Sequence, residues 1–294
     1  MTDKKAYIIA GPTASGKSDF ADMLARRVNG TIINCDSVQI YRGIENISAS
    51  PFAGRAVTDC IDGVPYRLFS ILGLDEHISV ADYIKLARQE YDAAVGEGRV
   101  PIFVGGTGYY INGIINGIAN IPDIRPEIRE QARKMVAQDL HAARKMVPGC
   151  VANDPQRVAR AIEVFLQTGR HLSDWWRDAR VGAIMPTPTK ILIKPQMSQL
   201  RVRIASRVPQ MLAGGALDEA RMIIQNNFDA TRAIGAAQLC DLLLGKVPQD
   251  VAIRNWITKT NQYAKRQRTW FKTQFVADVI INRVPKPDDI NLVF

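Results

Sequence analysis

The sequence GPTASGKSDF, which spans Gly11–Phe20, is the strongest indicator of the fold. The spacing of Gly11 from Gly16-Lys17-Ser18 is that of a loop whose backbone N–H groups cradle phosphate. Apolar residues 6–10 come directly before it and predict a buried strand, and apolar side chains at helical spacing predict a helix over 17–28. This context favours a phosphate site over a glycine-rich turn without a ligand. The loop alone does not name the reaction, because many NTPases and kinases share it.

Strand and helix patterns alternate along the rest of the chain. Strands are predicted at 31–35, 100–104, 190–194 and 278–282, and helices at 81–97, 199–226 and 251–273. Such alternation predicts an α/β fold, a P-loop NTPase-like parallel sheet flanked by helices. Helical patterns at 126–146 and 155–178 interrupt it, with no strand between them. We therefore expect a catalytic core from 1–112 and 187–294, and a helical insertion subdomain over 113–186.

Composition limits the class of protein and its partners. The 294 residues are 47% hydrophobic and 23% charged, as in ordinary soluble domains. The apolar stretches are too short to span a bilayer and no signal peptide is present, so we expect a cytoplasmic monomer without a membrane partner. Four scattered cysteines without a CxxC pair argue against a zinc site. The net charge of +9 favours a polyanionic partner over plain solubility, since the cations are clustered.

Two polar motifs follow predicted strands. DSVQIY begins at Asp36, after the strand at 31–35, and GGTG spans Gly105–Gly108 after the strand at 100–104. Because the carboxyl ends of parallel strands meet at one edge of a sheet, both motifs should converge with the phosphate loop on one crevice. Asp36 could ligate a metal, act as a general base or cap the next segment. Thr107 offers a hydroxyl at the same rim, although GGTG could also be only a tight turn.

A basic stretch, RNWITKTNQYAKRQRTWFK, occupies residues 254–272 and contains six Lys or Arg residues and no acid. Its aromatic residues recur every seven positions and predict a buried helix face; they are Trp256, Tyr263 and Trp270. The cations, Lys265 and Arg266 among them, predict binding to a phosphate backbone rather than only a solvated face. A second basic motif, DPQRVARAIEVFLQTG at 154–169, places two arginines one turn apart, either as surface charges or as a nucleic-acid contact.

The ordered set of motifs resembles the tRNA dimethylallyltransferase family, the bacterial tRNA isopentenyltransferases. The resemblance extends over residues 6–272 and rests on GPTASGKS, DSVQIY, VGGTG, the segment 122–129, DPQRVARAIEV, the region from RVRIASRV to Gly235, and YAKRQRTWF. It implies a Mg²⁺-dependent transfer of a dimethylallyl group from dimethylallyl pyrophosphate. The acceptor would be N6 of adenine 37, in the anticodon stem-loop of tRNAs that read codons beginning with U. The loop then holds the diphosphate that leaves.

The resemblance also implies roles for individual residues. Asp36 matches the position of the base that accepts the proton of the adenine amine. The leaving diphosphate would be stabilised by Lys17, by Thr107 and by one or both of Arg203 and Arg207. The diphosphate-binding loop consists of Gly11, Pro12, Thr13, Ala14, Ser15, Gly16, Lys17 and Ser18, of which Ser18 would also ligate Mg²⁺.

The tRNA contacts implied by the resemblance lie in two segments. After Asp36 they are Ser37, Val38 and Gln39, and the Gln39 amide could read an adenine edge. In the insertion they are Arg129, Gln156, Arg157, Val158, Ala159 and Arg160. The chain departs from the family at Ala236-Ala237, where an aromatic and a basic residue are common. Adenine 37 would have to leave the stacked loop to reach the site.

Two alternatives belong to other classes of protein. A P-loop kinase of a nucleotide or small metabolite shares the loop and the sheet, but it leaves the basic stretch at 254–272 unexplained. An RNA-binding module with an inactive loop leaves the intact Lys17-Ser18 pair and Asp36 unexplained. Asp36→Ala separates the transferase from the RNA-binding module, because a transferase should lose turnover by that change while its tRNA binding largely survives.

Overall fold

The computed structural model describes residues 5–148, 154–178, 180–185 and 187–294. The chain divides into two compact units. Unit 1 consists of Met1–Ile115 and Ile184–Phe294, and unit 2 of Asn116–Ala183. Unit 2 therefore lies inside the segment 113–186 for which the sequence predicts an insertion; Pro186 at its predicted end lies outside the described residues, as does Cys150.

Unit 1 contains a seven-stranded sheet with the order β3-β4-β2-β5-β1-β6-β7. Its strands are β1 (Tyr7–Ala10), β2 (Gly30–Asn34), β3 (Cys60–Ile61), β4 (Val64–Arg67), β5 (Val100–Gly105), β6 (Thr189–Ile193) and β7 (Val279–Ile281). All neighbouring strands are parallel except β3 and β4, which are antiparallel. The predicted parallel α/β fold is confirmed. The β3–β4 hairpin was not predicted, because a two-residue strand has no periodicity to detect.

The helices of unit 1 are α1 (Lys17–Val28), α2 (Val80–Gly96), α3 (Gly108–Asn116), α8 (Met197–Met211), α9 (Leu217–Gln225), α10 (Ala236–Leu243) and α11 (Gln249–Gln274). Three further turns are η1 (Leu212–Ala216), η2 (Ala230–Arg232) and η3 (Pro287–Val293). The single helix predicted over 199–226 is wrong: η1, a π-helical segment, separates α8 from α9. Gly215 there has φ 113°, which a residue with a side chain rarely adopts.

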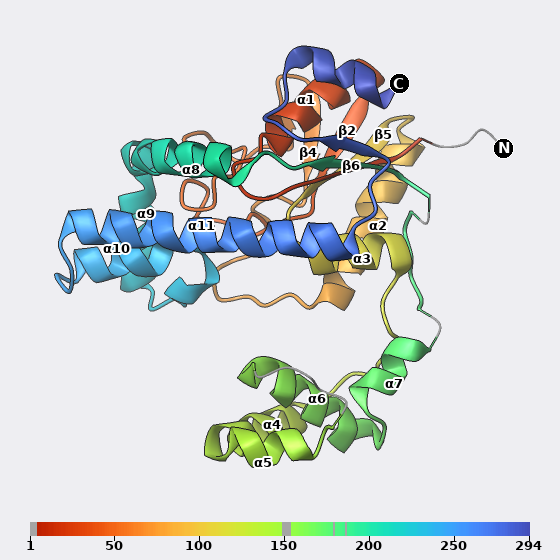
Figure 1. Cartoon of the computed structure of the whole chain (residues 1–294), viewed down its shortest axis with the longest axis vertical. Coiled ribbons are helices and arrows are strands. Elements are labelled where there is room, and N and C mark those ends of the chain that lie inside the picture. The colour runs from red at the N-terminus through yellow and green to blue at the C-terminus, as the bar shows by residue number, and fades with distance from the viewer. Residues whose placement is uncertain (1–4, 149–153, 179, 186) are drawn as a thin grey trace. The chain divides into compact units, whose positions relative to one another are not determined.

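The hydrophobic core lies between the sheet and its helices. Alternate residues of a strand point to opposite faces, so Tyr7 and Ile9 of β1 pack with Phe20 and Leu24 of α1 in one buried cluster. Figure 1 shows α2 on the other side of the sheet, and its Tyr83 is fully buried. The strands between these layers are almost wholly buried, which matches their continuous apolar runs.

Unit 2 is helical: α4 (Pro126–Gln138), α5 (Leu140–Lys145), α6 (Pro155–Thr168) and α7 (Leu172–Arg177). The predicted helix over 126–146 is interrupted at Asp139, whose carboxylate caps α5 by accepting from the N–H groups of His141 and Ala142, both at 2.9 Å. The predicted helix over 155–178 ends early, because Gly169 adopts a left-handed conformation after α6. These helices enclose a small core of their own.

Candidate active site

The phosphate-type loop connects β1 to α1, and residues 11–18 shape it. A Cβ at Gly11 would lie 2.5 Å from the Ile193 carbonyl oxygen, so only glycine fits there. Gly16 has φ 88° and immediately precedes the first turn of α1. The loop therefore ends at a helix N-terminus, where backbone N–H groups and the helix dipole favour an anion.

Two arginines of α8 reach the loop from the side. Arg203 Nε donates to the Ala14 carbonyl oxygen at 2.8 Å, and Arg207 Nη2 donates to Thr13 Oγ1 at 2.8 Å. The two residues are four positions apart, one helical turn, so both guanidinium groups lie on the same face of α8. The sequence left open which of the two contacts the loop; the structure places both against it.

These cations are half-buried, and none of them forms an ion pair with an acid among the described residues. Burial lowers the pKa of Arg207 to about 10, with nearby Arg203 acting in the same direction and Asp36 opposing it. Burial also lowers the pKa of Lys17, which Asp36 raises and Arg207 lowers further. Arg207 Nε and Ser15 Oγ are buried without a hydrogen-bond partner. A half-buried cluster with unused donors is suited to a multiply charged anion.

Asp36 lies two residues after the end of β2, and the Asn34 side chain binds its backbone N–H and its carbonyl oxygen. Its backbone N–H donates to Asn34 Oδ1 at 2.9 Å, while Asn34 Nδ2 donates to the Asp36 carbonyl oxygen at 3.0 Å. One carboxylate oxygen, Oδ1, accepts from the Val38 N–H at 3.0 Å, so the capping alternative holds for that oxygen. The structure assigns no protein hydrogen bond to Oδ2 among the described residues, which leaves it available to a substrate.

The two strand-end motifs are joined to each other. The Ser37 N–H donates to Thr107 Oγ1 at 2.9 Å, and Thr107 Oγ1 lies 3.2 Å from Ser37 Oγ. The Thr107 N–H donates to the Cys35 carbonyl oxygen at 3.3 Å. A Cβ at Gly105 would lie 1.9 Å from that same oxygen, so the glycine allows the two loops to approach. Thr107 therefore fixes the segment that carries Asp36.

Gln267 of α11 was missed by sequence reasoning. Its Oε1 accepts from the Thr13 N–H at 2.8 Å, and its Nε2 donates to the Gly106 carbonyl oxygen at 3.1 Å. Only 6% of the residue is exposed. The sequence carried a signal, because Gln267 stands four residues after Tyr263 and three before Trp270, on the aromatic face of the helix. A lone amide on a face predicted to be buried needs partners there.

The remaining face of α11 is basic. Lys265 and Arg266 are exposed, and neither forms an ion pair with a described residue. Arg268 is not part of that surface: its Nη1 donates to the carbonyl oxygens of Lys194, at 3.4 Å, and Pro195. The prediction of a buried aromatic face is confirmed for Trp256, which is 1% exposed, while Tyr263 and Trp270 are half-buried.

In unit 2, the predicted tRNA contacts differ in exposure. Arg129, Gln156 and Arg157 are exposed, and Arg160 pairs with Glu163 at 3.1 Å. The side chains of Val158 and Ala159, which belong to the predicted run 156–160, are buried rather than exposed. They are 0% and 6% exposed, because they form the apolar face of α6 that packs into the core of unit 2.

Gln39 is also more constrained than expected. Its Nε2 donates to the carbonyl oxygens of Ser48, at 3.2 Å, and Ala49, at 2.9 Å. An adenine edge could therefore meet only its carbonyl oxygen, as an acceptor, and not both ends of the amide. Gln39 lines a small cavity beside the loop, whose other lining residues are Lys17, Ser18, Ala21, Ile32, Pro51, Tyr66, Phe69 and Val104.

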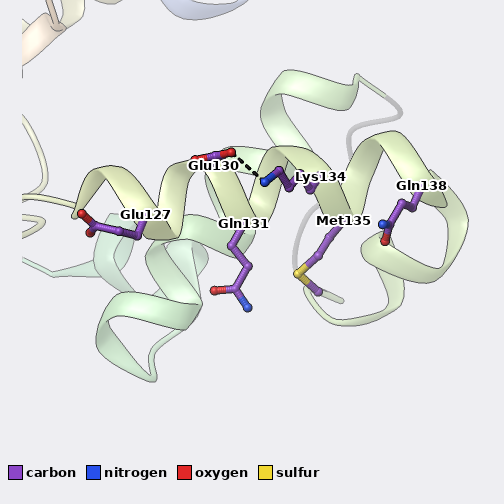
Figure 2. A pocket seen from close by; sticks show the side chains of 6 residues that line it. All are labelled: Glu127, Glu130, Gln131, Lys134, Met135 and Gln138. Atoms are coloured by element: carbon purple, nitrogen blue, oxygen red, sulfur yellow. Dashed lines mark ion pairs between the residues drawn. The ribbon is translucent and has the colours of Figure 1, made fainter.

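A larger hollow lies on the surface of unit 2, along α4 (Figure 2). It is lined by Glu127, Glu130, Gln131, Lys134, Met135 and Gln138. Glu130 and Lys134 form an ion pair across one helical turn, at 2.7 Å. Because all six residues come from a single helix and the hollow is open, it lacks the converging groups of a catalytic site. The strand-end site of unit 1 remains the candidate.

The described residues lack two features, a cluster of metal ligands and a membrane-spanning helix. The ranges that the structure covers contain no group of three or more His, Cys, Asp or Glu side chains arranged to hold a metal ion. Among the same residues, no helix has both the length and the apolar character needed to cross a membrane.

Family profiles and known proteins match this chain over most of its length. The profile of a family described as IPP transferase matches residues 39–274, and that of isopentenyl transferase matches residues 4–59. A tRNA dimethylallyltransferase of Rhodospirillum rubrum is 38% identical over 289 residues, covering 94% of this chain and 87% of the relative. That of Sphingopyxis alaskensis is 39% identical over 279 residues, covering 91% and 89%.

Solved structures resemble the chain along nearly its whole length. The full-length tRNA isopentenylpyrophosphate transferase of Bacillus halodurans superposes with a TM-score of 0.70 at 30% identity, covering 99% of this chain and 94% of that one. A eukaryotic dimethylallyltransferase acting on tRNA gives a TM-score of 0.77 at 26% identity, covering 95% and 74%.

Proposed function

The chain belongs to the IPP transferase family of tRNA dimethylallyltransferases, and from that membership we propose that it transfers a dimethylallyl group from dimethylallyl pyrophosphate to N6 of adenine 37. The proposed acceptor is the anticodon loop of tRNAs that read codons beginning with U, and the proposed compartment is the cytoplasm. The observation that carries the proposal is one site in which a half-buried cation cluster, Lys17, Arg203 and Arg207, adjoins the carboxylate of Asp36.

The cation cluster suits the donor's diphosphate. Arg207 keeps its Nε free of protein partners although it is buried, so an anion there would satisfy it. Arg203 contacts the loop from α8 and Lys17 stands at the end of the loop, where N–H groups at the start of α1 add further donors. Negative charge grows on the diphosphate as it departs, so these groups stabilise the transition state more than the bound donor.

The chemical step uses Asp36 and the acceptor amine. The N6 nitrogen attacks the allylic carbon of the donor, forming an N–C bond while the C–O bond to diphosphate breaks and its electron pair leaves with the diphosphate. The amine is a weak nucleophile, and Asp36 Oδ2 accepts its hydrogen bond and then its proton. Because Oδ1 is held by the Val38 N–H, the carboxylate keeps one orientation through the step.

Ser18 is suited to hold Mg²⁺ together with oxygens of the donor. It is exposed at the first turn of α1, and magnesium in such loops takes one or two protein oxygens plus phosphate and water. When bound, the ion supplies charge neutralisation to the departing diphosphate. The ion would not replace the three cations. Lys17 stands at the end of the loop, and Arg203 and Arg207 contact the loop from α8.

Two surfaces are suited to tRNA. The cations Lys265 and Arg266 on α11 belong to the unit that carries the active site, and they would bind phosphates near the acceptor base. Arg129, Gln156 and Arg157 are exposed on unit 2 and would bind elsewhere on the anticodon stem-loop. Recognition would use loop shape and an extruded base rather than duplex sequence.

The test is a transfer assay. Purified protein is mixed with Mg²⁺, radiolabelled dimethylallyl pyrophosphate and unmodified tRNA that carries adenine at positions 36, 37 and 38. After nuclease digestion, we expect label on the nucleoside next to the anticodon, and none when adenine 37 is replaced by guanine.

A parallel reaction with γ-labelled ATP and candidate small acceptors tests the kinase alternative. Phosphate transfer without label in tRNA would overturn the proposal. Tight tRNA binding without either transfer would favour an RNA-binding module instead. The comparisons favour the transferase over both, since every relative described above is a transferase that acts on tRNA.

A further inference from the structure

Gln267 stands in the middle of a chain of hydrogen bonds that crosses the active site. On one side its Oε1 accepts from the Thr13 N–H at 2.8 Å, and Thr13 Oγ1 accepts from Arg207 Nη2 at 2.8 Å. On the other side its Nε2 donates to the Gly106 carbonyl oxygen at 3.1 Å. The residue after Gly106 is Thr107, which holds the Ser37 N–H at 2.9 Å.

The two ends of this series of hydrogen bonds lie at the two substrate-binding sides of the proposed site. Arg207 and Thr13 belong to the side that binds the donor's diphosphate. Thr107 and Ser37 belong to the side that carries Asp36. The chain of bonds connects the two sides through one amide, and that amide is 94% excluded from solvent, since only 6% of the residue is exposed.

The surroundings of Gln267 make the link stiff. Trp270, one turn later on α11, packs against Gly108 so closely that a Cβ there would lie 2.4 Å from its ring. A Cβ at Gly106 would lie 2.2 Å from Gln267 Nε2 itself. Two of the three glycines of the GGTG motif, Gly106 and Gly108, therefore allow the approach of α11, and the amide cannot shift without moving the loop that contains Thr107.

We propose that Gln267 is a positioning residue that sets the separation between the donor's diphosphate and Asp36. It touches neither substrate. It fixes the phosphate loop through Thr13 and the GGTG loop through Gly106, so that the allylic carbon and the N6 amine meet at reacting distance. This inference rests on the proposed function, because it needs a donor on one loop and an acceptor on the other.

The same link joins substrate binding to the tRNA-facing surface. Lys265 and Arg266 precede Gln267 directly on α11 and point to solvent, whereas Gln267 points to the loops. A tRNA that binds the outer face of α11 would therefore contact the same helix whose Gln267 is hydrogen-bonded to the diphosphate loop. The placement gives Gln267 a part in orienting both substrates, not only in filling the core.

The decisive variant is Gln267→Met, which keeps the length of the side chain and removes both hydrogen bonds. We expect kcat to fall about 10–100-fold, because small misplacement of reacting groups costs that much. The Kd for tRNA, measured by filter binding, should change less than about twofold, since no phosphate contact is lost. Single-turnover rates with saturating donor separate the kcat effect from any change in donor KM.

A matched control comes from the same helix. Thr260 is as buried as Gln267, at 6% exposed, but its Oγ1 donates only to the Trp256 carbonyl oxygen within α11. Thr260→Val should lower the melting temperature without lowering kcat. Both variants are assayed well below their melting temperatures, so that unfolding does not contribute.

A second variant tests the bonds themselves. In Gln267→Glu, a protonated carboxyl can accept from Thr13 and donate to Gly106 as the amide does, whereas the carboxylate cannot donate. The ratio of its kcat to that of the native protein should therefore rise as pH falls. A merely structural role predicts no such rise.

The outcomes are distinguishable. If the native protein transfers no label to tRNA, the proposed function fails. If it does, but Gln267→Met keeps native kcat or loses kcat only in parallel with thermal stability, the positioning role is overturned. A flat pH ratio for Gln267→Glu would also count against it.

Discussion

The two units of the chain handle positive charge in opposite ways. In unit 1, Lys17 and Arg207 are half-buried at the loop, and no carboxylate among the described residues forms an ion pair with either. In unit 2, charged side chains lie at the surface and are commonly paired, as in Glu130–Lys134 at 2.7 Å and Arg170–Asp178 at 3.0 Å. Both units are rich in cations, but the loop cations of unit 1 are partly withdrawn from water and form no ion pair with a described residue.

The difference separates a binding site from a solvated surface. A buried cation costs free energy unless an anion meets it, so its retention indicates a ligand that supplies the missing charge. An exposed ion pair contributes little to stability or binding and is screened by salt. Net charge alone could not have made this distinction, because it counts both kinds of cation equally.

The largest expected effect concerns the acid at the edge of the half-buried cluster. Asp36→Asn keeps the shape of the side chain and removes the group that accepts the proton, so kcat should fall about 10²–10⁴-fold. Rapid-quench measurement of label transfer gives the rate, and filter binding gives tRNA affinity, which should be retained. Retained turnover would show that Asp36 is not the base that accepts the proton.

The second prediction tests whether the cations at the loop bind an anion. Arg207→Met should weaken donor binding about 10–100-fold, because a charge-assisted hydrogen bond is lost. The pKa of Arg207 is lowered in the folded protein, so at neutral pH the charge opposes folding in the absence of donor. The ligand-free variant should therefore unfold at higher temperature, with a gain of about 1–3 kcal/mol.

Lys134→Met on unit 2 is the matched control for that stability effect. Lys134 is exposed and paired with Glu130, so its loss should change the free energy of unfolding by less than about 1 kcal/mol, and not upward. Calorimetry with and without inorganic diphosphate measures both variants. Equal responses of Arg207→Met and Lys134→Met would show that burial makes no difference here.

A smaller effect appears with pH. Burial lowers the pKa of Lys17 below its ordinary value of 10.5, so Lys17 loses its charge at a lower pH than an exposed lysine does. The donor Kd should rise, roughly tenfold, as pH climbs through that lowered pKa, and the rise should be weaker in Lys17→Arg, whose guanidinium stays charged. Titration calorimetry across alkaline pH measures it, and a Kd independent of pH would argue against Lys17 as a diphosphate ligand.

The smallest effect belongs to the exposed cations of α11. Lys265→Ala combined with Arg266→Ala should weaken tRNA binding several-fold and make its salt dependence shallower by about 1.4 in the log–log slope, for two lost phosphate contacts. Lys134→Ala, which removes a cation already paired within its own helix, should leave the slope nearly unchanged. An unchanged slope in the double variant would place the α11 surface outside the tRNA interface.

Local patterns were sufficient for most of the fold. The helix predicted over 17–28 is α1 to the residue, and the strands predicted at 100–104 and 190–194 are β5 and β6 within one residue at each end. Apolar periodicity lies within each segment, so it is visible without the partners of that segment. The breaks at Asp139, Gly169 and η1 were missed, because capping and a local π-helical turn depend on single residues within otherwise helical patterns.

The candidate site divides in the same way. The positions of the phosphate loop, Asp36 and Thr107 at strand ends could be predicted, because a parallel sheet brings strand ends together. Gln267 could not be assigned a partner, since Thr13 and Gly106 lie 254 and 161 positions away. Arg203 and Arg207 could not be separated, because residues one turn apart carry the same pattern.

The class of fold, the position of the phosphate-type loop, the family and the residue types available for the chemistry could all be predicted from the sequence, since they follow from local spacing and order. Only the tertiary structure decided which cations are half-buried, which carboxylate oxygen is free, and which amide connects the two halves of the site. Burial and long-range hydrogen bonds depend on what the rest of the chain places around a residue, and no local pattern contains that information.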